Sequence, residues 1–295
     1  MAQVTRRDVL LGLALTGIAP GIARATAPTV SDQLRDLEAA AGGRLGVAAL
    51  DLDSHTRWTY RADELFALCS TFKLLAAAYV LARVDRGQEN LTRRVVFSGL
   101  DVVDYSPITV QHIGAPGLDM AALCEAAVTL SDNTAANLIL ASFGGPAALT
   151  AYLRTLGDSV TRLDRIETDL NEAIPGDPRD TTSPAAMLGL MEKLLVGDAL
   201  SARSRTQLNA WLKASETGDN RLRAGFPVEW VVGDKTGTGG FNTTNDVAIA
   251  WPPERAPVLI TCYYTDSPGQ PAMREYVLAE VARTITAQIV RSERR

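Results

Sequence analysis

Ser70 and Lys73 stand three residues apart, at the start of an apolar run that predicts a buried helix over residues 74–81. Positions i and i+3 of a helix lie on one face, so the Lys73 ammonium can stand beside the Ser70 hydroxyl. The first turn of a helix also has free backbone N–H groups, which favour developing negative charge. A neighbour that takes its proton makes a serine a competent nucleophile. The pair alone is weak evidence, because Ser-x-x-Lys occurs by chance in roughly half of chains this long and can be a surface pair.

A second polar segment, Ser131-Asp132-Asn133, follows the apolar run 126–130. A loop here would aim one hydroxyl and one amide into a cleft. Taken alone, the segment is better interpreted as a helix cap, because Ser, Asp and Asn are preferred capping residues and a helix-like run begins at Thr134.

A third segment, Lys235-Thr236-Gly237-Thr238, ends a predicted strand that begins at Val228. A cation and two hydroxyls at a strand edge suit the carboxylate of an anionic ligand. Glycine lets that ligand lie close to the backbone. A glycine-rich hairpin turn is the competing interpretation of this segment.

Residues 162–182 have little helix signal, and a long segment without secondary structure is usually functional. Glu167 and Asn171 lie within it. A carboxylate within hydrogen-bond reach of a water molecule can act as a general base. Without the other motifs, an ordinary solvated acidic loop is the better interpretation of this segment.

The composition is that of an ordinary globular protein, with 295 residues, 46% hydrophobic and 21% charged. The formal charge is −5, and the first 25 residues carry +2, which leaves −7 for the remainder. This acidic remainder argues against nucleic acid and anionic membrane surfaces as partners. Three cysteines and two histidines do not form a disulfide framework or a metal-ligand pattern, so we expect no metal and no cofactor.

The N-terminus has the pattern of an export signal. Arg6 and Arg7 precede an uncharged run from Val9 to Ala23, and a small-x-small sequence ends at Ala25. The run is shorter than the roughly 20 residues of a membrane span. The paired arginines favour the twin-arginine route. We therefore predict a signal peptide over residues 1–25, a periplasmic or secreted protein and no stable membrane anchor; a cytosolic protein with an apolar N-terminal helix is the alternative.

Strand patterns occur near both ends of the chain, and helical patterns occur between them and at the termini. The predicted helices span residues 30–41, 119–130, 134–143, 184–195 and 273–290, and the predicted strands span 45–52, 57–60, 228–234, 246–251 and 257–264. Ser31 or Asp32 is expected to cap the first helix. This order predicts two lobes, a sheet with terminal helices and an inserted helical domain.

The three polar segments occur together, and in the order that is typical of penicillin-binding proteins and class A β-lactamases. With Glu167-x-x-Leu170-Asn171 added, the chain resembles a class A serine β-lactamase over essentially all of the mature chain. Within that class, residues 174–182 and 242–251 look closest to the extended-spectrum cefotaximase group. The resemblance implies an α/β (α+β) two-lobed fold with an antiparallel sheet. Residues 26–65 and 214–295 would form the sheet domain, and 66–213 the all-helical domain that carries the 162–182 loop.

The resemblance also implies the site and its substrate, a small β-lactam antibiotic bound by a monomer. The implied catalytic residues are Ser70, Lys73, Ser131 and Glu167. The implied substrate-binding residues are Asn133, Asn171, Lys235, Thr236, Gly237, Thr238, Arg221 and Tyr105. Ser70 would attack the lactam carbonyl, with Lys73 or Glu167 taking its proton. Tyr105 resembles the aromatic wall of the cleft, and a partly exposed loop tyrosine is its alternative.

Several positions refine or depart from the family pattern. Arg165 and Asp180 resemble the ion pair that closes the loop. Thr168 stands where many members have proline, which puts the cis peptide bond often found there in doubt. Arg221 would replace the carboxylate-binding arginine that other members place at the position of Thr244, although it could be a salt-bridged surface residue.

Cys69 precedes the nucleophile, as in members that pair it with a second cysteine. Gly239 occupies that second position here, so we expect no such disulfide.

Two other functions share part of the pattern. A cell-wall DD-peptidase has the first three motifs but lacks the Glu-x-x-Leu-Asn loop. A β-lactam sensor module is acylated and stays acylated. Glu167 and Asn171 favour the hydrolase.

Overall fold

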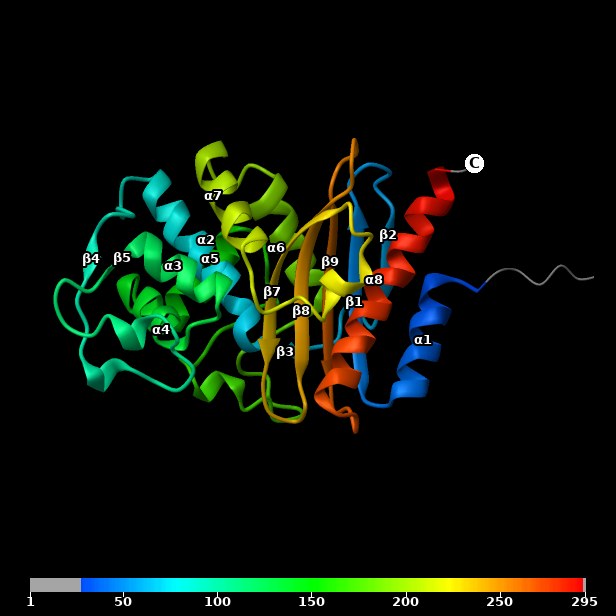
Figure 1. The fold of residues 1–295 in the computed structure, drawn as a ribbon, viewed down its shortest axis with the longest axis horizontal. Coiled ribbons are helices and arrows are strands. Elements are labelled where there is room, and N and C mark those ends of the chain that lie inside the picture. The colour runs from blue at the N-terminus through cyan, green and yellow to red at the C-terminus, as the bar shows by residue number, and fades with distance from the viewer. Residues whose placement is uncertain (1–27, 294–295) are drawn as a thin grey trace, which may run out of the picture.

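The computed structural model describes residues 28–293, which form a sheet lobe and a helical lobe side by side (Figure 1). The sheet is antiparallel, with strand order β2-β1-β9-β8-β7. Its strands are β1 (Arg44–Asp51), β2 (Arg57–Tyr60), β7 (Val231–Thr238), β8 (Thr244–Trp251) and β9 (Val258–Thr265). The five strands predicted from the sequence are confirmed, and their bounds agree to within two residues except for one strand.

The shifted strand is β7. It begins at Val231 rather than at Val228, which is fully exposed. The backbone N–H of Trp230 donates to the carbonyl of Pro227 at 3.0 Å, so residues 227–230 form a turn before the strand. The strand continues through Lys235 and Thr236 to Thr238, so these residues lie within the sheet and not in a hairpin turn.

Helices α1 (Val30–Ala41) and α8 (Pro271–Glu293) cover the outer face of the sheet (Figure 1). The N-cap of α1 is Thr29, not Ser31 or Asp32. The Thr29 hydroxyl accepts from the N–H of Asp32 at 3.2 Å, and the Asp32 carboxylate accepts from the N–H of Thr29 at 3.1 Å. This reciprocal capping box satisfies two backbone donors, whereas a single cap would satisfy one.

The helical lobe surrounds α2 (Phe72–Asp85), whose residues from Leu74 to Ala78 are all fully buried. The other helices of this lobe are α3 (Met120–Thr129), α4 (Asn133–Ser142), α5 (Pro146–Thr155), α6 (Pro184–Met191) and α7 (Ala202–Lys213). Two short ladders complete it, β3 (Phe66–Ala67) with β6 (Thr181–Thr182) and β4 (Arg94–Val95) with β5 (Leu118–Asp119). A helix that is buried on all sides has a continuous apolar sequence, and residues 74–81 of α2 are such a run.

Alternate residues of the central strands feed two separate cores. On β1, Val47 and Ala49 pack toward α1 and α8, whereas Ala48 and Leu50 pack toward the helical lobe. Because side chains alternate across a strand, covering both faces makes the whole strand apolar. The sheet is thereby covered on both faces, and its β7 edge contacts α7 and the Cys69–Thr71 turn that leads into α2.

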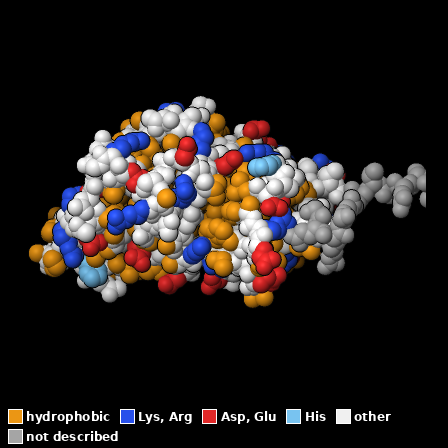
Figure 2. All heavy atoms as spheres, turned by 90° about the horizontal axis from the view of Figure 1, so that it is seen from above, with side chains coloured by type: hydrophobic (Ala, Val, Ile, Leu, Met, Phe, Trp, Pro, Cys, Tyr) orange, Lys and Arg blue, Asp and Glu red, His pale blue; other side chains and the backbone are white. Residues whose placement is uncertain are grey.

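The surface is mixed in charge: on the face shown in Figure 2, acidic and basic side chains are interspersed. Among the described residues, no single helix is long and apolar enough to cross a membrane, and α4 and α5 reach that length and composition only as a bent pair.

Candidate active site

Ser70 lies in a one-turn 3₁₀ helix, Cys69–Thr71, that leads into α2, and it is 8% exposed. It opens onto a cleft of about 490 Å³ between the two lobes. The cleft is lined by Ser70, Tyr105, Ser131, Asn133, Asn171, Glu216, Thr217, Arg221, Thr236, Gly237 and Thr238. Nine of the twelve predicted site residues therefore line one cavity. The other three, Lys73, Glu167 and Lys235, are buried and contact residues of this lining.

Lys73 is fully buried and contacts three predicted site residues. Its Nζ lies 3.0 Å from Glu167 Oε1 and donates to Asn133 Oδ1 at 2.6 Å and to the carbonyl of Ser131 at 2.7 Å. The Ser70 hydroxyl donates to Glu167 Oε1 at 3.4 Å, so this carboxylate contacts both Ser70 and Lys73. Burial lowers the pKa of Lys73, and the charge of Glu167 opposes that shift.

Ser131 joins the two buried lysines. Its hydroxyl accepts from Lys73 Nζ at 3.3 Å and from Lys235 Nζ at 3.1 Å. Burial, and then the charge of Lys73, lower the pKa of Lys235 to about 7. A hydroxyl between two amines of lowered pKa can pass on a proton and receive another.

The segment at 131–133 satisfies both interpretations of its sequence. The Asp132 carboxylate caps α4, accepting from the N–H of Ala135 at 2.8 Å. It also accepts from the N–H and the hydroxyl of Thr109, both at 2.9 Å. Ser131 and Asn133, on either side of this fixed residue, turn toward Lys73.

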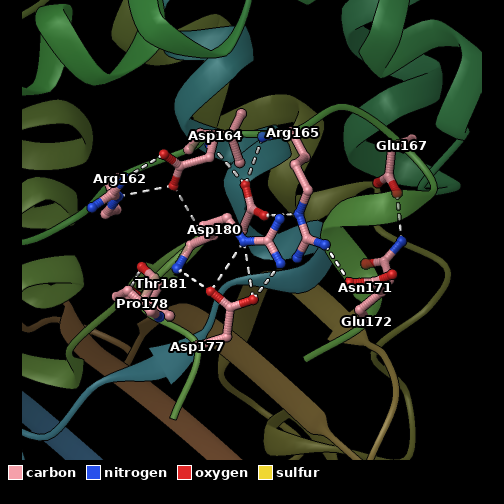
Figure 3. Close-up of polar contacts among 12 residues, drawn as sticks. Arg162, Asp164, Arg165, Glu167, Asn171, Glu172, Asp177, Pro178, Asp180 and Thr181 are labelled. Carbon is pink, nitrogen blue, oxygen red and sulfur yellow. Dashed lines mark hydrogen bonds and ion pairs between the residues drawn. The ribbon is translucent and has the colours of Figure 1, made fainter. Parts of the chain in front are cut away.

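The loop 162–182 is anchored by the predicted ion pair. Arg165 Nε lies 2.6 Å from Asp180 Oδ2, and Arg165 also pairs with Glu172 (Figure 3). The buried Asp180 carboxylate further accepts from the backbone N–H groups of Asp164 at 2.7 Å and Arg165 at 2.9 Å. One carboxylate thus ties the two ends of the loop together.

Glu167 is held in place by two amides. Asn171 Nδ2 donates to Glu167 Oε2 at 2.5 Å (Figure 3). Asn137 forms two hydrogen bonds with the main chain of Glu167. The Asn137 Nδ2 donates to the Glu167 carbonyl at 2.9 Å, and the Asn137 Oδ1 accepts from the Glu167 N–H at 2.8 Å. The peptide bond between Glu167 and Thr168 is cis. Sequence reasoning missed Asn137; the available signal was its place one helical turn after Asn133, on the same face of α4.

Known proteins resemble this chain along nearly its whole length. A family model described as "Beta-lactamase enzyme family" matches residues 29–289. The chain belongs to this family. It is 45% identical over 269 residues to β-lactamase OXY-2 of Klebsiella oxytoca, with 91% of this chain and 92% of the relative covered. It is 44% identical over 288 residues to β-lactamase Toho-1 of Escherichia coli, with 97% and 99% covered.

Solved structures agree on the class. An ancestral (GNCA) class A β-lactamase is 59% identical and superposes with a TM-score of 0.87, covering 88% of this chain and 100% of that chain. The two-lobed α/β fold of a class A β-lactamase, predicted from the motifs, is confirmed.

Arg221 lies in the cleft wall at the end of β7. It is 8% exposed and lines the cleft. It donates to the carbonyls of Gly237 at 2.9 Å and Asn245 at 2.8 Å, and to Thr238 Oγ1 at 2.8 Å. Its Nε lies 3.6 Å from Glu275. The guanidinium is therefore fixed behind the end of β7, and it is not a surface residue.

Tyr105 is 62% exposed and lines the cleft, as predicted. Its carbonyl accepts from the N–H of Asn133 at 3.0 Å, which ties its loop to α4.

The cysteine next to the nucleophile is free. Cys69, Cys124 and Cys262 are unpaired and buried, which confirms the expectation for Cys69. A Cβ atom added at Gly239 would lie 2.6 Å from Cys69 Sγ and 2.7 Å from the carbonyl oxygen of Asn171. Glycine at 239 therefore lets the end of β7 pack closely against both the nucleophile turn and the 162–182 loop.

Two further cleft residues, Glu216 and Thr217, were not predicted. Thr217 Oγ1 and Thr236 Oγ1 share a hydrogen bond of 2.6 Å. The polar run 215–221 before β7 was the signal that could have found them. Among residues 28–293, no group of three or more His, Cys, Asp and Glu side chains could hold a metal ion.

Proposed function

We propose that this protein hydrolyses the amide bond of penicillins and cephalosporins through an acyl-enzyme on Ser70, and so gives resistance to β-lactam antibiotics. The observation that carries the proposal is the position of Glu167, which contacts both Ser70 and Lys73 and is held by Asn137 and Asn171. A carboxylate fixed beside the nucleophile is what the second, hydrolytic step requires.

Acylation uses the two buried amines. Ser70 Oγ attacks the lactam carbonyl carbon, and its proton passes to neutral Lys73, or to Glu167 through a water. The lowered pKa of Lys73 supports the first route, and the contact between Ser70 and Glu167 supports the second. The backbone N–H groups of Ser70 and Thr238 stabilise the oxyanion, each worth about 3 kcal/mol in comparable enzymes. When the C–N bond breaks, the Ser131 hydroxyl protonates the lactam nitrogen and takes a proton in turn from Lys73, whose Nζ donates to it at 3.3 Å.

Deacylation needs a water molecule activated by a general base. Glu167 takes a proton from a water that Asn171 helps to position, and the resulting hydroxide attacks the ester carbonyl. The ester C–O bond breaks, and Ser70 recovers its proton. The product is a ring-opened amino acid and free enzyme.

Substrate recognition rests on charge and hydrogen bonds. Lys235, Thr236, Thr238 and Arg221 bind the substrate carboxylate, with Gly237 leaving room for the ligand beside the strand. Asn133 contacts the side-chain amide, and Tyr105 forms the wall.

A hydrolysis panel of a penicillin, two cephalosporins and a carbapenem tests the function. We expect turnover of the penicillin and the cephalosporins. Stoichiometric acylation without turnover would favour a sensor module, and cleavage of a D-alanyl-D-alanine peptide instead of the lactams would favour a DD-peptidase.

Arg221→Ala should lower kcat/KM, because it should raise the activation free energy by about 1.5–3 kcal/mol, the range for a hydrogen bond to a charged group. The expected reason is lost attraction for the substrate carboxylate. Steady-state kinetics on a penicillin and its carboxylate methyl ester will check it, since the ester should respond much less. Unchanged kinetics for the free acid would exclude Arg221 from substrate binding.

The pH dependence of kcat/KM should follow the protonation state of Lys235. Its cationic form attracts the substrate carboxylate, so kcat/KM should fall as pH rises through about 7, the pKa of Lys235 in the free enzyme. Arginine stays protonated at every pH of the assay, so Lys235→Arg should remove this limb. A basic limb at the same pH in both enzymes would assign it to another group.

The proposed site of action is the periplasm or the exterior. The signal-peptide prediction rests on residues 1–25, which lie outside the described residues. Replacing Arg6 and Arg7 with lysine should leave precursor in the cytoplasm and abolish resistance of whole cells. Fractionation with immunoblotting checks this, and unchanged periplasmic activity would exclude the twin-arginine route.

A further inference from the structure

Glu216 is an acidic side chain on the cleft wall that the proposed chemistry does not use. It lines the same cavity as Ser70, and its side chain is exposed. Among the described residues that line this cleft, it is the one carboxylate, since Glu167 lies buried behind the lining. No ion pair neutralises Glu216 within residues 28–293. Its charge is therefore available to a ligand in the cleft.

The backbone places Glu216 beside the carboxylate-binding residues. Its N–H donates to the carbonyl of Thr129 at 3.0 Å, which fixes its main chain against the end of α3. The next residue, Thr217, shares the 2.6 Å hydrogen bond with Thr236. Ser215, on the other side, donates to Asp234 Oδ2 at 2.9 Å. The segment is thus tied to β7 on both sides of Glu216.

The geometry of a cephalosporin brings one substituent to this place. The carbon that carries its C3 substituent is bonded to the carbon that carries the carboxylate. A carboxylate bound at Thr236 and Lys235 therefore brings the C3 substituent close to the neighbouring wall. A penicillin has no such substituent, because two methyl groups occupy the corresponding carbon of its ring.

We propose that Glu216 is a specificity-determining residue that favours cephalosporins with a positively charged C3 substituent, such as a quaternary ammonium group. This proposal rests on the proposed hydrolysis and on its carboxylate site. The unpaired carboxylate attracts a cation at this position and repels an anionic substituent.

Three substrates separate this effect from a general one: a cephalosporin with a quaternary ammonium at C3, one with a neutral acetoxymethyl group and a penicillin. Glu216→Gln should lower kcat/KM about two- to fivefold for the cationic substrate, the size of an exposed ion pair. The other two substrates should change little. Glu216→Lys should lower kcat/KM for the cationic substrate further. Raising the salt concentration should make the difference between wild type and variant smaller.

Asp219→Asn is the matched control. Asp219 also carries a carboxylate near this segment, with a side chain 75% exposed, but it pairs with Arg223 and does not line the cleft. The control should leave the ratio of cationic to neutral turnover unchanged.

An unchanged ratio in Glu216→Gln, or an equal loss for all three substrates, would overturn the proposal. So would an equal change of the ratio in Asp219→Asn, which would indicate net charge alone. Failure of the wild-type enzyme to hydrolyse any of the three would instead overturn the proposed function.

Discussion

Glu167→Ala should accumulate a covalent adduct on Ser70 that is only fleeting in the wild-type enzyme. Ser70 and Lys73 remain in place, so the lactam ring should still open, although more slowly. No carboxylate then activates the water that attacks the ester. A general base contributes about 10²–10⁴-fold to its step, so turnover should fall by at least that factor.

Intact-mass spectrometry after mixing with a cephalosporin measures this directly. The variant should gain the mass of the opened antibiotic and keep it for many wild-type turnover times. Ser70→Ala should gain none. Asp169→Ala is a matched control, because this exposed carboxylate lies two residues further along the same loop and should leave turnover intact.

Three outcomes would contradict the assignments. A stable adduct on the wild-type protein would favour the sensor or the peptidase. Rapid turnover by Glu167→Ala would move the base to another residue. No adduct on either protein, without hydrolysis, would exclude Ser70 as the nucleophile.

Asp180→Ala should destabilise the protein by about 3–5 kcal/mol, the cost of breaking a buried ion pair. The Asp180 side chain is 1% exposed, and removing it leaves Arg165 and two backbone N–H groups without this acceptor. The loop that carries Glu167 should loosen, so turnover should fall as well. Glu172 still pairs with Arg165 and limits the loss.

Urea unfolding checks the stability change, since a lower midpoint at constant slope reports lost stability. Asp177→Asn serves as the control within the same loop, because Asp177 pairs with the exposed Arg179. It should move the midpoint little. Equal midpoints for Asp180→Ala and the wild type would show that the ion pair does not anchor the loop.

The sequence by itself was sufficient for the motifs and most of the elements. Ser70 and Lys73 are close because three residues separate them at the start of a helix, and that relation is local. The strands of the central sheet read as continuous apolar runs because both faces are covered. The sequence also predicted a functional loop over residues 162–182, because this long segment lacks a helix or strand pattern.

Only the tertiary structure decided how the distant segments meet. Glu167 is 97 residues from Ser70 in sequence, and Lys235 is 104 residues from Ser131, yet both pairs are in hydrogen-bond contact. Those contacts depend on how α2, the loop and the edge of β7 pack, which no local pattern encodes.

The same reason explains the residues that sequence reasoning missed or misplaced. Asn137 and Glu216 carried only weak sequence signals, a helical spacing from Asn133 and a polar run before β7, and it is the fold that places one against Glu167 and the other in the cleft wall. For Arg221 the sequence favoured a cleft residue and left a salt-bridged surface residue as the alternative, and its burial against the end of β7 excludes the alternative. Residue type and spacing determined which chemistry was available, and packing between the lobes decided which side chains can take part in it.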